Sequence, residues 1–465
     1  MSNEQKQLDE QKEVIDEKGY KHIIPPNSKI ASGGQGVVYR TTDKNLAIKQ
    51  PLKFERYPDW VAKYNEVFSY IRTLPLPKGI HISFPIACLR DEPGYVMRLL
   101  NDMNPFSIFF KEGNCHNAIS KDNLPDWLSQ IQDKDFAQEL AYYAETGSTR
   151  FRLYALYKCA SILARLHNAG IVYGDISDNN VFIEKSADNF VGKDIPCDSW
   201  YIDNETSCNC WLIDADNLCL ESFRGGNFIY TPTFGAPELV QGKAFVRPRT
   251  DCWAFAVMAF RILTLYHPFI GKMVEEGHWS KQSISSDITQ QAYAGYLPYI
   301  DDEQDKSNSA RGKSFREVVL NSPLRTLFQE TFGAGRLQPH RRPSMSFWAL
   351  ELARAFDNSI VCPHCKMSYF NAPVFEGCPY CEKPRPAFVI AKTDRWQMNL
   401  FDGNKVSFQK TLPHRLFHPF SLTSGGSEEY IADINWESRT VKHALGTDPF
   451  PPGLKFEFVG SIEQD

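Results

Sequence analysis

The chain has 465 residues and a formal net charge of −5, and 42% of its residues are hydrophobic while 23% are charged. These are the proportions of a globular protein with a buried core, and the length favours two or three domains. The charge balance argues against sequence-independent binding of nucleic acid. The longest apolar run, 252–260, stops at Arg261 and is too short to cross a bilayer. Neither nucleic acid nor a membrane is therefore expected as a partner.

The N-terminal segment, 1–25, is polar and mixed in charge, which is the opposite of a signal peptide. Since it offers little to bury, we expect it to be a disordered leader. Most of the 12 cysteines stand singly, apart from two CxxC pairs near residue 370. This pattern does not fit a secreted disulfide-bonded protein. The sequence predicts a cytoplasmic protein, in a reducing compartment, with one metal site.

Three further zones differ in composition. Residues 26–356 begin with strand-like segments and continue with strongly helical ones, ending on an amphipathic helix. Residues 357–384 contain both CxxC pairs, and residues 385–465 alternate short strand-like segments with turn residues. The predicted class is α+β: a large mixed domain, a small metal-binding module and a small β-rich accessory domain.

A glycine-rich hairpin is the first motif with chemical meaning. Small residues at Ala31, Gly33, Gly34 and Gly36, followed by Val38, join two of the first predicted strands. A turn without bulky side chains lets backbone N–H groups approach phosphate oxygens. Most hairpins of this kind are only turns, so the motif by itself is weak evidence.

A lysine follows on the next apolar strand, after Ala47. A buried ammonium is costly unless it is paired, so Lys49 needs a carboxylate partner. Glu66, within a helical pattern, is the expected partner, and Glu55 is the alternative. The competing interpretation is that Lys49 lies on an edge strand and faces solvent.

Polar residues then follow the long amphipathic helix that ends near residue 170. Asp175 and Asn180 precede a short strand containing Phe182, and Asp214 follows the next apolar strand. A carboxylate can orient an acceptor hydroxyl and take its proton, while an amide oxygen and a second carboxylate can bind Mg²⁺. Each residue alone is more often a cap or a solvated group. Their order behind a glycine-rich loop and a lysine favours phosphoryl transfer.

This series of motifs resembles that of protein kinases, with Ala31 in the first glycine position of their phosphate-binding loop. The resemblance covers about residues 26–356 and implies a bilobal fold with a β-rich N-lobe and a helical C-lobe. It implies ATP, with Mg²⁺ or Mn²⁺, as cofactors. The catalytic residues it implies are Lys49, Asp175, Asn180 and Asp214, with Asn180 and Asp214 holding the metal. The nucleotide site it implies consists of Ala31, Gly33, Gly34, Gly36, Val38, Ala47, Lys49, Glu66 and Phe182.

Later segments resemble the structural motifs of the same family. Residues 231–238 are similar to the end of the activation segment, in which Thr231 is expected to contact Asp175. Asp251 opens a helix and is expected to cap the catalytic loop. Arg342 is expected to pair with Glu238.

The sequence departs from the kinase pattern at several positions. Gly174 stands where an arginine normally reads an activation-loop phosphate, so activation by loop phosphorylation is not expected. Ser177 replaces a lysine that contacts the transferring phosphate, which lowers the expected rate. Ala215 and Asp216 replace the Phe and Gly after the metal-binding aspartate, and Asp216 adds a carboxylate that can face the metal.

Two insertions also distinguish the chain, at 111–150 and 185–209. Cys208 and Cys210 form a CxC at the end of the second insertion. We interpret this CxC as a loop feature, because no second pair of ligands lies near it in the sequence.

The two CxxC pairs have the spacing of a zinc ribbon. They consist of Cys362, Cys365, Cys378 and Cys381. Two such turns present four thiolates to one ion, which makes a closed, structural Zn²⁺ site. A redox CxxC is the alternative, but it leaves one pair unexplained. His364 lies between ligands and is interpreted as a bystander.

The combination of kinase motifs and zinc ribbon resembles bacterial kinase-like proteins associated with tellurite-resistance gene clusters. The segments that support this are 173–180 (YGDISDNN), the D-x-D at 214–216, the HPF at 267–269, and the RPS at 342–344 followed by Trp348. The resemblance implies two partners, a von Willebrand factor A domain protein and a metal-dependent Ser/Thr phosphatase. It also implies a role in bacterial signalling or stress response.

The predicted function is Ser/Thr-type protein kinase activity, in which Mg·ATP phosphorylates a protein hydroxyl. A pseudokinase, acting as a nucleotide-binding scaffold for partner proteins, is the alternative that Gly174 and Ser177 support. Retention of Lys49, Asp175, Asn180 and Asp214 favours activity. A small-molecule kinase is disfavoured by the activation-segment motif and by Arg342.

Overall fold

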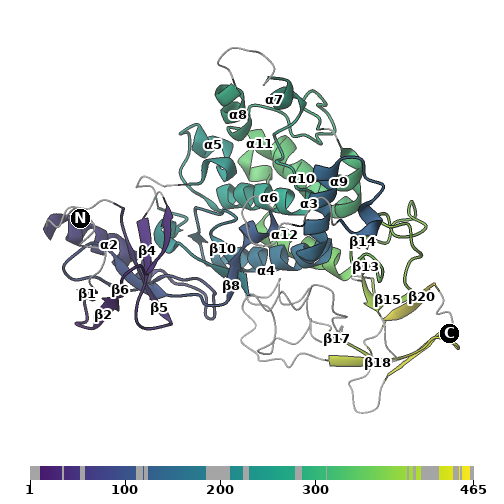
Figure 1. Ribbon diagram of the computed structural model, residues 1–465, viewed down its shortest axis with the longest axis horizontal. Coiled ribbons are helices and arrows are strands. Elements are labelled where there is room, and N and C mark those ends of the chain that lie inside the picture. Colours follow the sequence, from purple (N-terminus) through teal and green to yellow (C-terminus); the bar gives the residue numbers. More distant parts are fainter. Residues whose placement is uncertain are drawn as a thin grey trace.

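The computed structural model describes residues 11–33, 36–52, 58–110, 119, 124–184, 210–223, 230–277, 285–310, 312–394, 397–401, 405–409, 429–443, 450 and 453–460. These residues form a mixed structure of helices and sheets. Figure 1 shows strands at one end of the molecule, a helical body in the middle, and further strands beside the helical body at the other end. The predicted mixture of helix and sheet is confirmed.

The first sheet has five antiparallel strands in the order β3-β4-β5-β7-β6. Their bounds are Lys29–Gly33 for β3, Gly36–Arg40 for β4, Leu46–Gln50 for β5, Pro85–Cys88 for β6 and Tyr95–Arg98 for β7. Helix α2, Pro58–Thr73, packs on this sheet and buries Phe68 and Ile71. Because β5 has neighbours on both sides, its residues belong to the interior of the sheet.

An N-terminal hairpin corrects the expectation of a disordered leader. Strands β1, Lys12–Ile15, and β2, Lys21–Ile24, pair in antiparallel register. Val14 and Ile24 are buried together with Ile48 of the main sheet, so the segment does contain residues that fill a core. The Asp16 carboxylate accepts hydrogen bonds from the backbone of Lys18 and Tyr20 and closes the turn. Residues 1–10 lie outside the described part.

The middle of the chain is mainly helical. The helices are α3 (Lys134–Glu145), α4 (Ser148–Asn168), α5 (Pro237–Val240), α6 (Pro248–Thr264), α7 (Lys272–Gly277), α8 (Ser285–Tyr293), α9 (Lys313–Val319), α10 (Ser322–Gln329), a π-helical turn (Glu330–Ala334), α11 (Gly335–Leu337) and α12 (Met345–Asp357). Short 3₁₀ turns occur at Phe106–Phe109, Asp126–Leu128, Ala215–Asn217, Pro232–Phe234 and Pro339–Arg341. The apolar run expected to be too short for a bilayer lies in α6, where Cys252, Trp253 and Phe255 are buried. Among the helices that the structure describes, none has the length and apolar character of a membrane span.

Short strands form two further small sheets. Strands β8 (Met103–Pro105), β10 (Val181–Glu184) and β11 (Cys210–Leu212) form one sheet, and β9 (Ile171–Val172) pairs with β12 (Cys219–Leu220). Of the first insertion, 111–150, the described residues include the 3₁₀ turn Asp126–Leu128, α3 and the start of α4. The second insertion, 185–209, lies outside the described residues.

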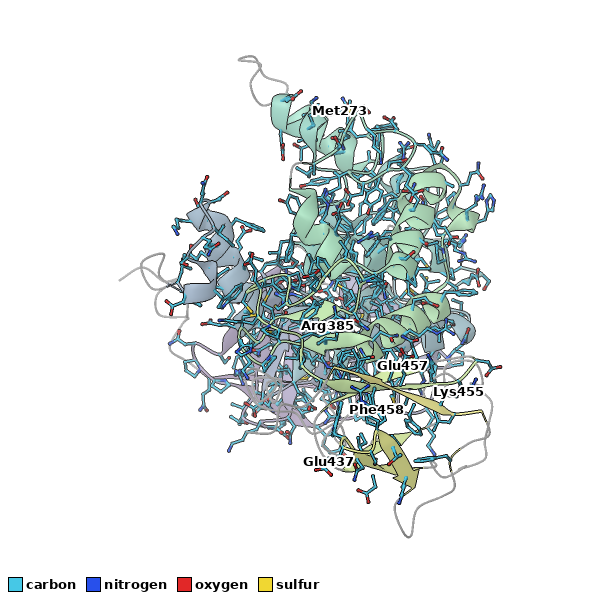
Figure 2. The ribbon with its side chains drawn as sticks, turned by 90° about the vertical axis from the view of Figure 1, so that its right-hand side faces the viewer. Met273, Arg385, Glu437, Lys455, Glu457 and Phe458 are labelled. Atoms are coloured by element: carbon cyan, nitrogen blue, oxygen red, sulfur yellow. The ribbon has the colours of Figure 1, made fainter. Side chains whose placement is uncertain are left out.

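In the part of the chain that the structure describes, eight strands follow the helical body. A pair, β13 (Ser359–Val361) and β14 (Ser368–Phe370), carries the first CxxC turn between its strands. The remaining strands are β15 (Phe388–Lys392), β16 (Gln397–Phe401), β17 (Lys405–Gln409), β18 (Glu429–Asn435), β19 (Thr440–His443) and β20 (Lys455–Val459). They form two three-stranded sheets, as expected for a β-rich C-terminal segment. Figure 2 shows Lys455, Glu457 and Phe458 along β20, where Glu457 is ion-paired with Lys392 of β15.

A fully buried arginine joins three parts of the helical body. Arg152 of α4 donates hydrogen bonds to the carbonyl oxygens of Ile262 at 3.0 Å and of Phe109 at 3.1 Å. It also bonds to the carbonyl of Tyr143 at 3.1 Å and lies over the ring of that residue. The hydroxyl of Thr146 accepts a further hydrogen bond from Arg152 at 2.9 Å. Burial lowers the pKa of Arg152 to about 10, so the guanidinium stays charged at neutral pH.

We expect Arg152→Met to lower the free energy of unfolding by on the order of 3 kcal/mol, because several buried carbonyls lose their donor. Urea unfolding followed by tryptophan fluorescence would measure the change. Arg165→Met, at an exposed position of the same helix, is the matched control and should cost less than about 0.5 kcal/mol. Equal effects of the two substitutions would contradict the role given to Arg152.

Candidate functional site

Lys49 lies in the middle of the first sheet and is buried. Strand β5 pairs with β4 on one side and β7 on the other, so the edge-strand interpretation of Lys49 is wrong. Its ammonium contacts Asp214 Oδ1 at 2.5 Å and Asp216 Oδ2 at 2.8 Å. Burial lowers the pKa of Lys49, but the charges of Asp216 and Asp214 outweigh this effect and the pKa is raised overall. Lys49 therefore remains protonated.

The expected ion pair between Lys49 and Glu66 is not formed. Glu66 is exposed, because α2 turns Phe68 and Ile71 toward the sheet and Glu66 away from it. The alternative partner, Glu55, lies outside the described residues. Asp216, which the sequence suggested as an extra metal-facing carboxylate, contacts Lys49 instead.

The glycine-rich hairpin forms next to this lysine. Gly33 and Gly36 are direct cross-strand partners, and Gly34 lies outside the described residues. A Cβ on Gly36 would come within 2.4 Å of the carbonyl oxygen of Gln50, so only glycine fits there. Ala31, Val38 and Lys49 are successive cross-strand partners, which places their side chains on one face of the sheet.

Other residues of the predicted nucleotide site are apolar and are buried or half-buried. Ala47, two residues before Lys49, is fully buried. Val38 is half-buried and packs against the core. Phe182 is half-buried on β10, directly opposite Trp211 of β11 and Pro105 of β8. Ala47 and Val38 thus share the face of Lys49, whereas Phe182 belongs to the separate sheet β11-β10-β8.

Asp175 follows β9 in a loop and is buried. Thr231 donates to its Oδ1 from the backbone at 2.9 Å and from the hydroxyl at 3.0 Å, as the sequence predicted. The amide nitrogen of Asn180 donates to the carbonyl oxygen of Asp175 at 2.9 Å and to Oδ2 at 3.1 Å. Burial raises the pKa of Asp175 against these hydrogen bonds, which lower it, and the net direction is upward.

The end of β11 brings Asp214 to the same place. The backbone N–H of Ile213 donates to the carbonyl of Asn180 at 3.0 Å, and the hydroxyl of Tyr173 donates to the carbonyl of Ile213. Asp214 itself has φ 57° and ψ 65°, a left-handed conformation that directs it toward Lys49. Burial and the neighbouring charge of Asp216 raise the pKa of Asp214 to about 6.

A buried carboxylate holds the loop that leads to Asp175. Asp251, at the start of α6, accepts from the backbone of Tyr173 at 2.8 Å and of Gly174 at 2.9 Å, as predicted. His167, at the end of α4, contacts the same carboxylate at 3.0 Å. Gly174 has φ 90°, and a Cβ there would approach Asn217 within 3.2 Å. The glycine at this position is therefore required by the backbone of the loop.

A second predicted ion pair also forms. Arg342 donates to both carboxylate oxygens of Glu238, at 2.7 and 2.8 Å, and lies over the ring of Trp253. The guanidinium is fully buried, and its remaining bonds go to backbone carbonyls of Gly335 and Arg249. This bidentate pair attaches the segment after Thr231 to the helical body.

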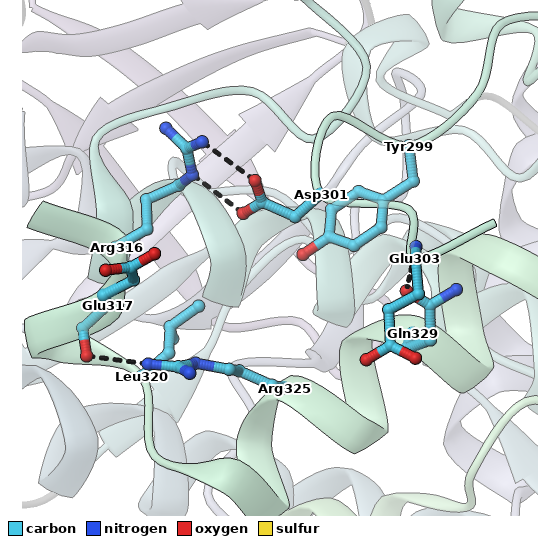
Figure 3. Close-up of a pocket in the computed structure, with 8 residues that line it drawn as sticks. All are labelled: Tyr299, Asp301, Glu303, Arg316, Glu317, Leu320, Arg325 and Gln329. Atoms are coloured by element: carbon cyan, nitrogen blue, oxygen red, sulfur yellow. Dashed lines mark hydrogen bonds and ion pairs between the residues drawn. The ribbon is translucent and has the colours of Figure 1, made fainter. Parts of the chain in front are cut away.

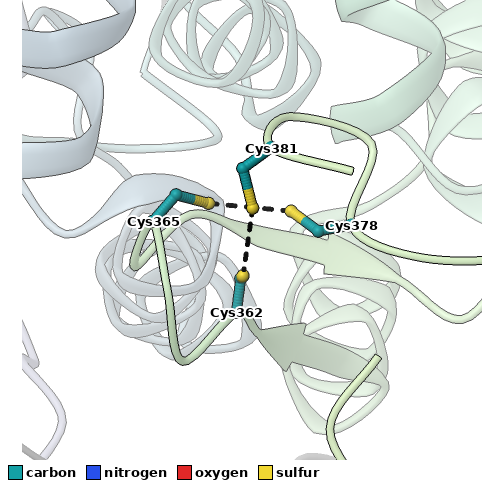
Figure 4. Close-up of side chains that lie close together, drawn as sticks. All are labelled: Cys362, Cys365, Cys378 and Cys381. Atoms are coloured by element: carbon teal, nitrogen blue, oxygen red, sulfur yellow. Dashed lines mark hydrogen bonds between the residues drawn. The ribbon is translucent and has the colours of Figure 1, made fainter. Parts of the chain in front are cut away.

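The four cysteines of the CxxC pairs meet at one point (Figure 4). Their sulfur atoms lie within 4.8 Å of one another, and the Cys362–Cys381 and Cys365–Cys378 sulfur distances are both 3.6 Å. Four thiolates around a single tetrahedral ion, at about 2.3 Å each, would lie about 3.8 Å apart. The cluster is therefore of a size that holds one metal ion.

The local backbone explains why the cysteines converge. In each CxxC turn, the residue after the second cysteine donates to the carbonyl of the first: Lys366 to Cys362 at 3.0 Å, and Glu382 to Cys378 at 2.9 Å. Both Lys366 and Glu382 have positive φ, 61° and 60°, which closes the two turns in the same way.

A pocket elsewhere in the helical body has a volume of about 140 Å³ and is drawn in Figure 3. None of the candidate site residues lines it. Arg316 is already bidentate with Asp301, at 2.7 and 2.8 Å, and Arg325 donates to the carbonyl of Glu317. Its two arginines have partners within the protein, and we assign the pocket no ligand.

Comparison with known proteins shows that part of the chain is similar to protein kinases. Over 174 residues the chain is 32% identical to protein kinase C-like 1 of Candida albicans, covering 37% of the chain and 13% of that protein. It is 28% identical over 142 residues to protein kinase C delta type of Homo sapiens, covering 30% of the chain and 18% of that protein. No protein-family model matches the chain. The matches thus span less than a fifth of these relatives' own length, and they support a kinase-like relationship for part of the sequence.

Sequence reasoning missed two residues of this site. Tyr95 of β7 donates to Asp216 Oδ1 at 2.5 Å, and His167 contacts Asp251. Tyr95 is an aromatic residue in an apolar strand, and nothing in its local sequence distinguishes it from a core residue. His167 carries a weak signal, because it is a polar residue at the end of a long apolar helix.

We expect the contribution of His167 to stability to depend on pH. Burial lowers its pKa, but hydrogen bonds to Asp251 and Cys252 raise it to about 9, above the usual value of 6.5. A raised pKa stabilises the fold fully below pH 6.5, and this stabilisation is lost as the pH rises through about 9. His167→Gln should therefore cost on the order of 2 kcal/mol at pH 6 and much less at pH 9.5, measured by urea unfolding.

The control for this experiment is His340→Gln, an exposed position at which no pH-dependent difference is expected. If His167→Gln costs the same at both pH values, the imidazolium–carboxylate pair does not exist in solution.

Proposed function

We propose that the chain is an ATP- and Mg²⁺-dependent protein kinase of the Ser/Thr type, with a bilobal kinase fold over residues 26–356. The observation that supports this best is the meeting of Lys49 with Asp214 next to the loop of Asp175 and Asn180. In protein kinases these four residue types perform phosphoryl transfer. The partial similarity to protein kinase C sequences supports the same function.

In this proposal each residue has one role. Lys49 neutralises the phosphates of ATP, and the hairpin of Gly33 and Gly36 brings backbone N–H groups to them. Asp175 orients the hydroxyl of the substrate protein and takes its proton as the γ-phosphoryl group leaves ATP. The upward shift in the pKa of Asp175 strengthens it as a base. Ala47, Val38 and Phe182 enclose the adenine.

The residues present suit a bound Mg²⁺. The amide nitrogen of Asn180 is engaged by Asp175, which leaves its oxygen for a cation. Asp214 uses Oδ1 for Lys49 and has Oδ2 available on the same carboxylate. Asn180 and Asp214 would hold the ion, which would supply positive charge to the phosphate oxygens. A hard oxygen donor set of this kind accepts Mn²⁺ equally well.

The proposal includes the wider setting that the sequence resemblance implies. We propose that the substrate is a protein and that the chain acts in the cytoplasm. We also propose that it takes part in bacterial signalling together with a von Willebrand factor A domain protein and a metal-dependent Ser/Thr phosphatase. Tellurite resistance belongs to the same proposal. The domain limits proposed for this architecture are 26–356, 357–384 and 385–465, with residues 11–25 added to the first domain because their hairpin packs on its sheet.

We also propose that the four-cysteine cluster binds structural Zn²⁺. The sulfur spacing and the two matching turns support a tetrahedral site without an open position. Hydrogen bonding from Cys365 and Cys378 lowers the pKa of Cys362, so the cluster stabilises a thiolate. The module is attached to α4: Ser368 donates from its backbone to Ser148 Oγ at 2.8 Å, and Arg150 donates from its backbone to Ser368 Oγ at 2.7 Å.

Asp175→Asn tests the kinase proposal. With labelled ATP and Mg²⁺, and with the two suspected partner proteins as acceptors, wild type should incorporate phosphate and the variant should lose about 100-fold or more of the rate. Asp91→Asn, at an exposed loop position, is the matched control and should keep full activity. Nucleotide binding without transfer by wild type would favour the pseudokinase.

Zinc content tests the second proposal. Purified protein should contain one zinc per chain, and Cys362→Ser should lose it together with several degrees of thermal stability. His364→Ala should retain the metal, because His364 is interpreted as a bystander. A metal-free protein with a reversible disulfide in either CxxC would support the redox interpretation instead.

A further inference from the structure

Asp216 connects two neighbouring strands of the first sheet. Lys49 of β5 and Tyr95 of β7 are direct cross-strand partners, so their side chains lie on one face. Asp216 Oδ2 accepts from Lys49 at 2.8 Å, and Oδ1 accepts from the Tyr95 hydroxyl at 2.5 Å. Both carboxylate oxygens are therefore occupied by partners from the sheet.

The hydrogen bond from Tyr95 sets the orientation of this carboxylate. Tyr95 is 1% exposed, and burial together with the charges of Asp216 and Asp214 keeps its pKa well above the usual value. The phenol thus stays protonated and acts as a donor. The ring is held in turn by Phe68 of α2, with ring centroids 4.5 Å apart.

The helical phase of α2 explains why Glu66 does not take this position. Val61, Phe68 and Ile71 are buried, and Tyr64 is half-buried, all at helical spacing on one face. Glu66 is two residues from both Tyr64 and Phe68, which places it about 200° around the helix axis from each. Turning Glu66 inward would expose Phe68, which costs about 2 kcal/mol or more.

We infer that Asp216 is the positioning residue that holds the Lys49 ammonium in this protein, in the place that a helix glutamate occupies in the kinase pattern. This inference rests on the proposed function for its catalytic consequence. The contact itself does not depend on that function, because it is the ion pair between Lys49 of β5 and Asp216 of the turn Ala215–Asn217.

The source of this carboxylate changes how the site is assembled. Asp214 and Asp216 come from a single turn, so the residue proposed to bind the metal and the residue that positions Lys49 move together. Lys49 then needs no carboxylate from α2.

The test is to measure steady-state kinetics with Mg·ATP for Asp216→Asn, with Glu66→Gln as the matched control. Asp216→Asn should lower kcat by about 10-fold or more, with a smaller change in KM for ATP, because the lysine is misplaced while the nucleotide pocket persists. Asp216→Glu should recover part of the loss, and Glu66→Gln should stay within about twofold of wild type. A loss confined to Glu66→Gln, or a gain in kcat for Asp216→Asn, would overturn the inference.

A second readout does not depend on activity. Competitive acetylation of Lys49, quantified by mass spectrometry across pH, reports the protonation of its amine in the full-length protein. Asp216→Asn should shift the midpoint downward by about one pH unit, since a buried ammonium loses one counter-charge. Tyr95→Phe, which releases the carboxylate without removing it, should shift the midpoint less in the same direction.

The two readouts separate this inference from the proposed function. If wild type transfers no phosphate, the kinase proposal fails, while acetylation still decides which carboxylate holds Lys49. An unchanged midpoint in Asp216→Asn, or a shifted one in Glu66→Gln, rejects the role of Asp216 whatever the activity. If Asp216→Asn keeps the thermal unfolding midpoint of wild type, its fold is intact. If Asp216→Asn does not fold, Tyr95→Phe tests the same contact.

Discussion

The buried ammonium of Lys49 is the constraint around which the candidate site is arranged. A cation in the interior of a sheet is tolerated only with counter-charges, and both carboxylates come from one turn that follows β11. The ion pairs of Lys49 with these carboxylates therefore connect the first sheet to the segment that follows β11. The same contact sets where Asp214 stands relative to the hairpin of Gly33 and Gly36. The arrangement on which the proposed phosphate and metal binding depends thus follows from neutralising one residue.

Helix α4 provides a second link, between the cysteine cluster and the loop of Asp175. At its N-terminal end, Ser148 and Arg150 bond to the strand that follows the first CxxC turn. At its C-terminal end, His167 shares the Asp251 carboxylate with the backbone that precedes Asp175. Between the two ends, Arg152 binds carbonyls from the neighbouring segments. One helix therefore contacts both the cysteine module and the segment that leads to Asp175.

The departures from the kinase pattern have structural reasons of their own. Gly174 has a positive φ and faces Asn217 closely, so a larger residue would strain the loop. Asp216 lies where kinases have a glycine, and here its side chain is engaged by Lys49 and Tyr95. These residues therefore belong to a consistent local arrangement, and they do not by themselves indicate a degraded site.

The sequence by itself determined the motifs whose geometry is local. Spacing within a hairpin or a CxxC turn is enough to predict the hairpin at Gly36 and the convergence of four cysteines, because few backbone conformations satisfy those spacings. The contact between Thr231 and Asp175, which joins distant segments, was expected only from the resemblance to kinases. Only the tertiary structure decided which carboxylate reaches Lys49. Glu66 has the right residue type in the right helix, but the phase of that helix depends on which residues it buries against distant strands. The N-terminal hairpin was missed for the same reason, since Val14 and Ile24 become core residues only when the main sheet is present.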